Sequence, residues 1–319
     1  MYKVTVVVPV YNAGLYIERC VRSLFDQTLA DIEYVFVDDC SPDNSIAILE
    51  SLLKEYPERA KSTKIIRHEK NTGQSGARRD GVLAATGDYI IHCDADDWVD
   101  LDMYQSMYEK AEAEGAEAVC CDIVLEFDAS SKNLSVTDAY DDHQLMCDCI
   151  APISVEYFSM CNRLVSRKVF ERNTILPFEG VNMWDDVGLC ARVRYYAKKT
   201  VAINKGFYHY NRQNELSTTR RPLIERAIEQ ERCIECIEDF FKKENDYDKY
   251  KLFVSYLRLV AAEDLFYYEP EFWRQKFIGL RADLWKLRRR YSIGRLFRFY
   301  TLSYGGFIGE LIWKTFWKR

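Results

Sequence analysis

An apolar run meets three carboxylates in the stretch Tyr89-Ile90-Ile91-His92-Cys93-Asp94-Ala95-Asp96-Asp97-Trp98-Val99. Residues 89–93 have the length and the β-branched content of a buried strand, and the preceding Gly87-Asp88 is typical of a turn. In open α/β sheets, ligands bind outside the carboxyl ends of the strands. The stretch therefore predicts an interior strand that delivers acidic side chains to a binding edge.

Two of these carboxylates favour a bound metal ion. Asp94 and Asp96 would point to the same side of a continuing strand, whereas Asp97 would point elsewhere. Close carboxylates repel each other and lose solvation unless a cation neutralises them. Oxygen ligands of this kind suit Mg²⁺ or Mn²⁺. The alternative is that Asp97 or Asp100 caps a helix that we predict to begin near Leu101.

Apolar strands and helices alternate along the first 125 residues. Val4-Thr5-Val6-Val7-Val8 is typical of a buried parallel strand, and the apolar residues after it repeat with a period near 3.6. Further strands are predicted at 32–37, 64–67, 89–93 and 118–125, and further helices at 46–53, 77–85 and 101–115. This alternation predicts a parallel sheet with helices on both faces, and the polar segments after the strands would meet at one edge.

The composition is that of a globular protein. With 319 residues the chain exceeds the usual size of one domain, so we expect a large domain and an appendage. Hydrophobic residues make up 48%, which argues against disorder. The eleven cysteines lack the paired spacing of a zinc site, so we expect reduced, mostly buried thiols. Met1-Tyr2-Lys3 runs directly into a strand without a signal peptide, which predicts a cytoplasmic protein.

The segment Asn71-Thr72-Gly73-Gln74-Ser75-Gly76 favours binding of an anion. Its two glycines relieve backbone crowding, and a helix that begins near Ser75 would point free amides at an anion. Arg78 and Arg79 add two cations. Together with a carboxylate-bound metal, these groups would form a diphosphate site. The alternative is an ordinary turn, with both arginines on a solvated face.

Four motifs resemble, in their order and spacing, those of family-2 glycosyltransferases with the GT-A fold. They are Val6-Val7-Val8-Pro9-Val10-Tyr11-Asn12, Val37-Asp38-Asp39-Cys40-Ser41, Asn71-Thr72-Gly73-Gln74-Ser75-Gly76-Ala77-Arg78 and Asp94-Ala95-Asp96-Asp97-Trp98. The resemblance covers roughly residues 1–220. It implies an α/β GT-A fold, Rossmann-like with a mostly parallel sheet, and inverting transfer from a nucleotide-sugar, usually a UDP-sugar, with Mn²⁺ or Mg²⁺.

The resemblance also implies which residues bind the donor. Residues of the nucleotide-sugar site would be Pro9, Tyr11, Asp39, Asn71, Arg78 and Asp94. In this set Tyr11 and Asp39 contact the base and ribose, Arg78 lies near the phosphates, and Asp94 faces the ribose or sugar. Asp96 would hold the metal, with His209 as a further ligand and Arg212 as a phosphate contact. The chain departs from the family pattern in two places, with Cys40 in place of glycine and Arg79 in place of asparagine.

A second acidic pair follows Trp184. If a helix begins there, Asp186 shares an apolar stripe with Leu189 and Val193, whereas Asp185 projects away. A carboxylate in this place either faces a cleft or satisfies the helix N-terminus, where a negative charge gains about 0.3–1 kcal/mol. The family resemblance implies the first role. Asp185-Asp186 would be the catalytic pair, and Asp186 would be the general base that takes the proton of the acceptor hydroxyl.

The end of the chain is basic. After residue 270 there are twelve Lys and Arg against three acids, in a chain whose net charge is −6. Amphipathic helical spacing with Trp285, Trp313, Phe316 and Trp317 favours attachment to an anionic membrane surface. The alternative is a helical appendage that packs on the catalytic domain or on another subunit. No apolar run reaches the ~18 residues of a spanning helix, and no motif indicates nucleic acid.

These patterns predict a GT-A domain over residues 1–220, with a nucleotide-binding half (1–125) and an acceptor half (126–220), and a helical region over 221–319 that is basic and amphipathic after about 271. We expect an enzyme on the inner face of the cytoplasmic membrane that moves a sugar to a glycan or lipid-linked oligosaccharide. The alternatives are a non-catalytic glycan- or nucleotide-binding scaffold, and a sugar nucleotidyltransferase, whose glycine- and arginine-rich amino-terminal loop is absent here.

Overall fold

The computed structural model describes residues 1–135, 158–215 and 220–269, together with the single residues 146, 217, 272 and 286. Most of the polar segment between 136 and 157 and almost all of the basic tail lie outside the described residues. The chain divides into two compact units, Met1–Ala139 with Val155–Leu216, and Tyr140–Ser154 with Ser217–Arg319. The division that we predict at residue 220 stays a prediction.

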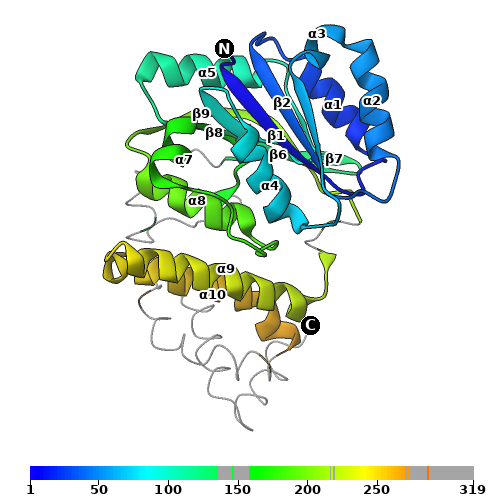
Figure 1. Ribbon diagram of the computed structural model, residues 1–319. Coiled ribbons are helices and arrows are strands. Elements are labelled where there is room, and N and C mark those ends of the chain that lie inside the picture. The colour runs from blue at the N-terminus through cyan, green and yellow to red at the C-terminus, as the bar shows by residue number, and fades with distance from the viewer. Residues whose placement is uncertain are drawn as a thin grey trace. The chain divides into compact units, whose positions relative to one another are not determined.

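A sheet of nine described strands organises the first unit (Figure 1). Its order is β3-β2-β1-β4-β8-β6-β9-β5, and β7 pairs with β6. The strands are β1 (Val4–Val10), β2 (Ile32–Asp38), β3 (Thr63–Arg67), β4 (Tyr89–His92), β5 (Trp98–Val99), β6 (Ala118–Phe127), β7 (Ser130–Leu134), β8 (Arg163–Ser166) and β9 (Thr200–Asn211). The β-branched runs of β1 and β2 are almost wholly buried, as expected of strands covered on both faces.

The predicted parallel arrangement is confirmed for the first four strands, because β1 pairs in parallel with both β2 and β4, and β2 with β3. Our predicted strands do not include residues 163–166, yet Arg163–Ser166 forms β8 and lies antiparallel between β4 and β6. The strand is only four residues long, too short to show a period in the sequence. Because β8 runs against both neighbours, β6 keeps the direction of β4.

Helices cover both faces of the sheet. On one face Val4, Val6 and Val8 pack with residues of α1 (Ile17–Phe25), α2 (Ser45–Glu55) and α5 (Met103–Glu114). On the other face Val35 and Val37 pack with Ala77 of α4 (Gly73–Ala84). The first unit also contains α3 (Pro57–Ala60), α7 (Arg167–Asn173) and α8 (Asp185–Tyr196).

Helix α4 lies unusually close to the sheet. A Cβ atom on its residue Gly81 would lie 2.2 Å from Cγ1 of Val7 in β1, so the packing requires glycine there. The helix begins at Gly73, four residues before the start that we predict from the apolar pattern. The glycines that resemble a turn are therefore its first turn, which places that turn at the carboxyl edge of the sheet.

The second unit contains a helical hairpin, made of α9 (Leu223–Lys243) and α10 (Tyr247–Tyr268). Phe241 stacks on Tyr250 across the turn, with ring centroids 4.3 Å apart. Arg258 of α10 donates to Glu231 and Glu238 of α9, at 2.7 Å in both cases. Among the residues that the structure describes, no helix combines the length and the apolarity needed to span a membrane.

Candidate active site

The loops after β1 and β2 are tied together at the carboxyl edge of the sheet. The backbone N–H of Asn12 donates to Oγ of Ser41 at 2.8 Å, and that of Asp39 donates to the carbonyl of Val10 at 3.0 Å. Tyr11 projects from this loop and is 52% exposed. The structure therefore places the exposed ring of Tyr11 and the carboxylate of Asp39 at one edge. Pro9 lies in the same strand end, paired with Val37.

Cys40 occupies a backbone conformation that glycine adopts most easily, with a φ of 60°. This is the position at which the family resemblance leads us to expect glycine. A cysteine in the left-handed region carries backbone strain of order 1 kcal/mol. The turn between β2 and α2 is thus kept in its glycine-like shape in spite of the side chain.

Asp39 binds the start of α4 rather than pointing freely outward. Its carboxylate accepts hydrogen bonds from the backbone N–H groups of Thr72 (2.7 Å) and Gly73 (2.8 Å) and pairs with Nδ1 of His68 (2.8 Å). Asn71 is exposed, and its Oδ1 also accepts from Gly73 N at 3.1 Å. The carboxylate is 2% exposed, so a nucleotide would meet only the rim of this group.

A further amide in the first turn of α4, that of Ser75, is also occupied. Oδ1 of Asn182 accepts from both the backbone N–H (3.2 Å) and the hydroxyl (3.0 Å) of Ser75. Gly73 has a φ of +82°, and a Cβ on it would lie 2.2 Å from the Asn182 side chain. Our expectation that this helix start offers free amides to an anion does not hold for Gly73 and Ser75. Their amides are taken up by two side chains of the protein itself, Asp39 and Asn182.

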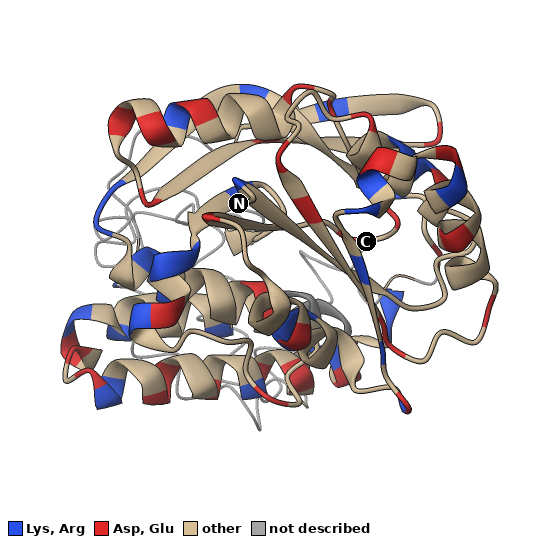
Figure 2. Cartoon of the chain, turned by 45° about the horizontal axis from the view of Figure 1, so that its top comes forward, with Lys and Arg blue, Asp and Glu red and all other residues tan. Residues whose placement is uncertain are grey.

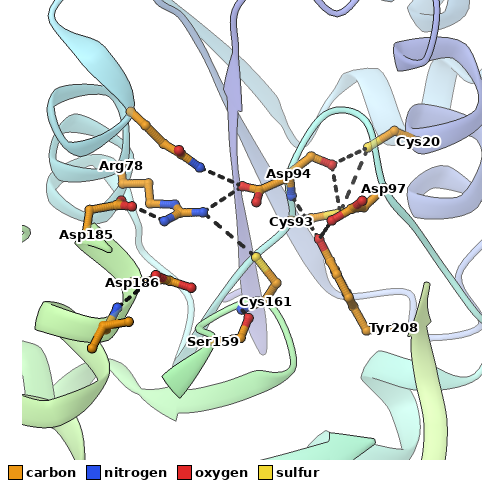
Figure 3. Close-up of polar contacts among 12 residues, drawn as sticks. Cys20, Arg78, Cys93, Asp94, Asp97, Ser159, Cys161, Asp185, Asp186 and Tyr208 are labelled. Carbon is orange, nitrogen blue, oxygen red and sulfur yellow. Dashed lines mark hydrogen bonds and ion pairs between the residues drawn. The ribbon is translucent and has the colours of Figure 1, made fainter. Parts of the chain in front are cut away.

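Arg78 lies at the centre of the acidic residues (Figure 3). Its Nη2 donates to Oδ1 of Asp94 at 2.7 Å and its Nη1 donates to Oδ2 of Asp185 at 2.6 Å. The side chain is 2% exposed, so the alternative of a solvated Arg78 is wrong. Asp185 is 3% exposed and points at Arg78, which corrects our expectation that it projects away. Arg78 thus joins the end of β4 to the first turn of α8.

The three acids after β4 have separate surroundings. Asp97 is buried, accepts from the Tyr208 hydroxyl and from the backbone N–H of Asn211 (2.8 Å), and does not cap a helix. Asp96 accepts from Nδ2 of Asn214 at 2.7 Å. Burial, together with the negative charge of Asp94, raises the pKa of Asp96 to about 6. A cation beside Asp96 would therefore stabilise the ionised form of its carboxylate.

His209 lies between two other acids. Its Nδ1 pairs with Glu126 at 2.8 Å and its Nε2 with Asp100 at 3.0 Å, so ligation of a metal through either nitrogen would require one of these contacts to break. Its ring stacks on Trp98, with centroids 5.2 Å apart, while the guanidinium of Arg19 covers Trp98 at 3.4 Å from the ring centroid. The side chains of His209 and Arg19 therefore cover the ring of Trp98.

Asp186 contrasts with its neighbour Asp185. Among the described residues its carboxylate accepts one hydrogen bond, from the backbone N–H of Val187 at 2.8 Å. Burial and the adjacent charge of Asp185 raise the pKa of Asp186 to about 7. Helix α8 begins at Asp185, and its N-cap is Trp184 in the left-handed region (φ 63°). Asp186 is therefore a partly buried carboxylate that combines high basicity with an uncommitted oxygen.

The residues present fit a hard divalent cation. Oδ1 of Asp96 accepts no side-chain hydrogen bond from the described residues, and neither does Oδ2 of Asp94, whose Oδ1 is taken by Arg78 and by Gln74. No group of three or more His, Cys, Asp and Glu in the described part of the chain has the geometry of a metal cage. Mg²⁺ and Mn²⁺ at nucleotide sites commonly take one or two carboxylates and complete their shell with phosphate oxygens and water.

Several polar residues of the site have no distinctive signal in the sequence. Asn182, Tyr208 and Asn214 come from segments far along the chain, yet they bind Ser75, Asp97 and Asp96. Lone Asn and Tyr residues belong to no motif. The contacts of Tyr208 and Asn214 follow from the return of β9 alongside β5 and β6, whereas Asn182 lies in the segment before α8. Arg212, which we expect to bind phosphate, lies over the ring of Tyr210 at 5.4 Å.

The fold is that of the GT-A class of nucleotide-sugar glycosyltransferases, as two solved structures show. S. aureus TarS (residues 1–349, in complex with UDP-GlcNAc) matches with a TM-score of 0.69 and 14% identity over 95% of this chain and 90% of that one. The mannosyltransferase PcManGT from Pyrobaculum calidifontis, in complex with GDP-Man and Mn²⁺, matches with a TM-score of 0.58 and 17% identity over 99% and 80%. At these identities the likeness concerns the fold alone.

Sequence comparison gives the family. The model of glycosyl transferase family 2 matches residues 5–174. The uncharacterized glycosyltransferase EpsJ of Bacillus subtilis is 31% identical over 229 residues, which are 69% of this chain and 63% of that protein. The chain belongs to glycosyltransferase family 2, and the predicted family and fold class are confirmed. Its match spans about three-fifths of the length of the curated relatives.

Proposed function

We propose that the protein transfers a sugar from a UDP-sugar to a hydroxyl of a glycan or lipid-linked acceptor, with inversion at the anomeric carbon and with the help of a divalent metal. The observation that carries this proposal is the Arg78 bridge, because it joins the acidic start of α8 to Asp94 at the strand edge where GT-A enzymes bind their donor. The helix start that carries the candidate base is thus linked to the candidate donor site through one buried guanidinium, that of Arg78.

The donor would bind along the carboxyl edge of β1, β2 and β4. Tyr11 offers an exposed ring for the base, and the rim of Asp39 with Asn71 borders the same edge. UDP is our choice of nucleotide because the four sequence motifs resemble those of enzymes that usually take it. Asp94 would face the ribose or sugar. We assign Arg78 a role other than the phosphate contact that the resemblance implies.

In the transfer step Asp186 would accept the proton of the acceptor hydroxyl while that oxygen attacks the anomeric carbon from the face opposite the nucleotide. The bond between the anomeric carbon and the diphosphate breaks, and UDP leaves with the bonding pair. A base works best when its pKa lies near the working pH, which the value of about 7 for Asp186 meets. Asp185 would stay ionised against Arg78 and hold the helix start in place.

The metal would be held by Asp96 and by the second oxygen of Asp94. Such an ion supplies charge to stabilise the departing diphosphate. His209 stays a proposed further ligand only if its pairing with Glu126 or Asp100 changes. The membrane contact of the basic tail and a lipid-linked acceptor are further proposals, since almost all residues after 270 lie outside the described part of the chain.

Titration of UDP with and without Mn²⁺ tests the donor site. We expect UDP to bind more tightly with Mn²⁺, and Asp96→Ala to remove this difference, because that substitution takes away the carboxylate whose charge the ion neutralises. Asp102→Ala is the matched control, since the side chain of Asp102 is half exposed and forms its ion pair only with Lys205 among the described residues. The measurement is calorimetric, followed by a screen of UDP-sugars for slow hydrolysis.

UDP affinity that is the same in Mn²⁺ and in EDTA, and unchanged by Asp96→Ala, would contradict the proposed metal site. Metal-linked binding without turnover of any UDP-sugar in the presence of glycan acceptors would instead favour the scaffold alternative.

A further inference from the structure

We propose that Arg78 is the positioning residue of the acceptor side, which fixes the first turn of α8 and thereby aims Asp186, and that it does not bind the donor diphosphate. This inference rests on the proposed role of Asp186 as the base. It assigns to Arg78, and to the Ser75–Asn182 contact beside it, a function that none of the sequence motifs indicates.

The first support is the commitment of the guanidinium. Both terminal nitrogens of Arg78 donate to carboxylates, to Asp94 at 2.7 Å and to Asp185 at 2.6 Å, and Nη2 also lies 4.0 Å from Sγ of Cys161 (Figure 3). The side chain is 2% exposed. The guanidinium keeps further N–H groups, but because the side chain is buried, a phosphate could reach them only if the residues packed around Arg78 moved.

The second support is another contact between α4 and the segment at the start of α8, about one helical turn from Arg78. Ser75 and Arg78 are three residues apart on α4 and therefore share a face. They bind Asn182 and Asp185, which are also three residues apart. One face of α4 thus holds the segment before α8 and the first residue of α8 at two points. Two points are enough to set both the position and the rotation of that helix start.

The third support is the geometry of adjacent residues in a helix. Successive side chains of an α-helix are about 100° apart around its axis. Because Asp185 is fixed against Arg78, the direction of Asp186 is fixed as well, and Asp186 accepts no hydrogen bond from Arg78 among the described residues. In Figure 3 the carboxylate of Asp186 lies beside the Arg78–Asp185 pair and is not joined to it.

The ammonium group of a lysine cannot replace the two-sided contact that the guanidinium of Arg78 makes with Asp94 and Asp185. Lysine at position 78 keeps the positive charge but offers one nitrogen, so it can hold Asp94 or Asp185 closely but not both in the present geometry. The first turn of α8 would then shift or rotate. A displacement of about 1 Å in a reacting group can cost ~10²-fold in rate. Binding of UDP, however, should change less than kcat, because Arg78 is 2% exposed and contacts the donor edge only through Asp94 among the described residues.

The experiment compares Arg78→Lys with Arg172→Lys. Arg172 is a matched control because it also grips a carboxylate with both terminal nitrogens, that of Glu117, but on an exposed part of α7. We expect Arg78→Lys to lower kcat by about 10–100-fold at saturating UDP-sugar and to change the Kd of UDP by less than about threefold. Arg172→Lys should change neither. Circular dichroism and melting curves show whether each variant folds.

Asn182→Ala gives a second test that does not disturb a buried charge. It removes the Ser75 contact, and we expect kcat to fall by about 3–10-fold with unchanged Kd for UDP, because one of two anchors remains. The effect should be in the same direction as that of Arg78→Lys.

The inference is overturned if Arg78→Lys weakens UDP binding tenfold or more, or if it leaves kcat unchanged. It is equally overturned if Asn182→Ala behaves as wild type in kcat. Failure of the proposed function is a distinct outcome, because a wild-type protein that transfers no sugar removes the role of Asp186. In that case the UDP affinity of Arg78→Lys still tests whether Arg78 binds the diphosphate. A loss of affinity would identify Arg78 as a phosphate ligand.

Discussion

At the scale of single residues, the carboxylates of the site differ because their neighbours differ. Asp185 is buried against a guanidinium, whereas Asp186 beside it receives, within the described part of the chain, only a backbone N–H. Asp97 is closed off by the Tyr208 hydroxyl and an amide. Identical side chains thus serve as an anchor, a candidate base and a structural acceptor. The charges of these groups follow from burial and partners, not from the residue type.

The pH dependence of transfer should report the environment of Asp186. Burial and Asp185 raise the pKa of Asp186 to about 7, and only the ionised carboxylate can accept a proton. We therefore expect kcat to fall about tenfold per pH unit below pH 7 and to level off above it.

The profile is measured with saturating Mn²⁺, donor and acceptor, since the pKa of Asp96 is also raised, to about 6, and would otherwise contribute through metal binding. An acidic limb near pH 4, the usual range of a carboxyl group, would contradict the assignment of an elevated pKa to the base.

The acidic pair shows where sequence reasoning stops at this scale. The period of the apolar residues indicates which positions share a helix stripe, but it does not show what lies opposite. Asp185 is turned inward because Arg78 lies there, and Arg78 precedes it by 107 residues. A contact that depends on a partner so far along the chain leaves no local pattern.

At the scale of elements, β1, β2 and the helix α4 are joined at the opposite end from the site by a buried carboxylate. Glu33 of β2 accepts from the hydroxyl of Thr5 (2.6 Å), from the N–H of Thr86 (2.7 Å) and from the ammonium of Lys64 (2.7 Å). Thr86 lies in the short segment between the end of α4 at Ala84 and the start of β4 at Tyr89. The Glu33 side chain thus ties its own strand, β1 and β3 to the segment between α4 and β4.

Glu33→Gln should lower the free energy of unfolding by about 1–3 kcal/mol, because the amide group of glutamine would oppose a donor and leave a buried partner unsatisfied. The matched control is Glu50→Gln, which removes a surface pair with Arg67 and should cost less than about 1 kcal/mol. Chemical denaturation at pH 7 measures both changes.

The difference between wild type and Glu33→Gln should depend on pH in a defined direction. Burial alone raises the pKa of Glu33, but Lys64, Thr5 and Thr86 together lower it below its usual range. The charge of Glu33 therefore stabilises the fold fully above the unfolded pKa of about 4.3 and loses this effect as pH falls through the lower folded value. A difference that grows on acidification would contradict this assignment.

Element prediction succeeded where the pattern was long and failed where it was short. The buried runs of β1 and β2 and the alternation with helices were sufficient to predict the parallel half of the sheet. The four residues of β8 carry no period, and their pairing depends on β4 and β6. The start of α4 was missed because Gly73 and Gly76 have low helix propensity, although contacts with Asp39 and Asn182 stabilise that turn.

At the scale of the whole molecule, charge is distributed without large single-sign regions on the described helices (Figure 2). Lys and Arg alternate with Asp and Glu along them, and the strands carry few charges. The strongly basic stretch of the sequence lies after residue 270, almost wholly outside the described residues. Attachment to an anionic membrane is therefore a prediction from composition alone.

The family and fold were predictable because four motifs occur at strand ends, and a parallel sheet gathers such ends at one edge. The residues that complete the site were not predictable, because Asn182, Tyr208 and Asn214 reach it from the later strands and loops. Sequence patterns thus reveal the donor half more readily than the acceptor half, since only the donor half consists of local motifs.

The most direct measurement is transfer by Asp186→Asn beside its affinity for UDP. If Asp186 removes the acceptor proton, the variant should lose ~10²–10⁴-fold in kcat, the usual contribution of a positioned base, while it binds UDP with Mn²⁺ as tightly as wild type does. Transfer at the wild-type rate by a folded Asp186→Asn protein would contradict the assignment of Asp186 as the base.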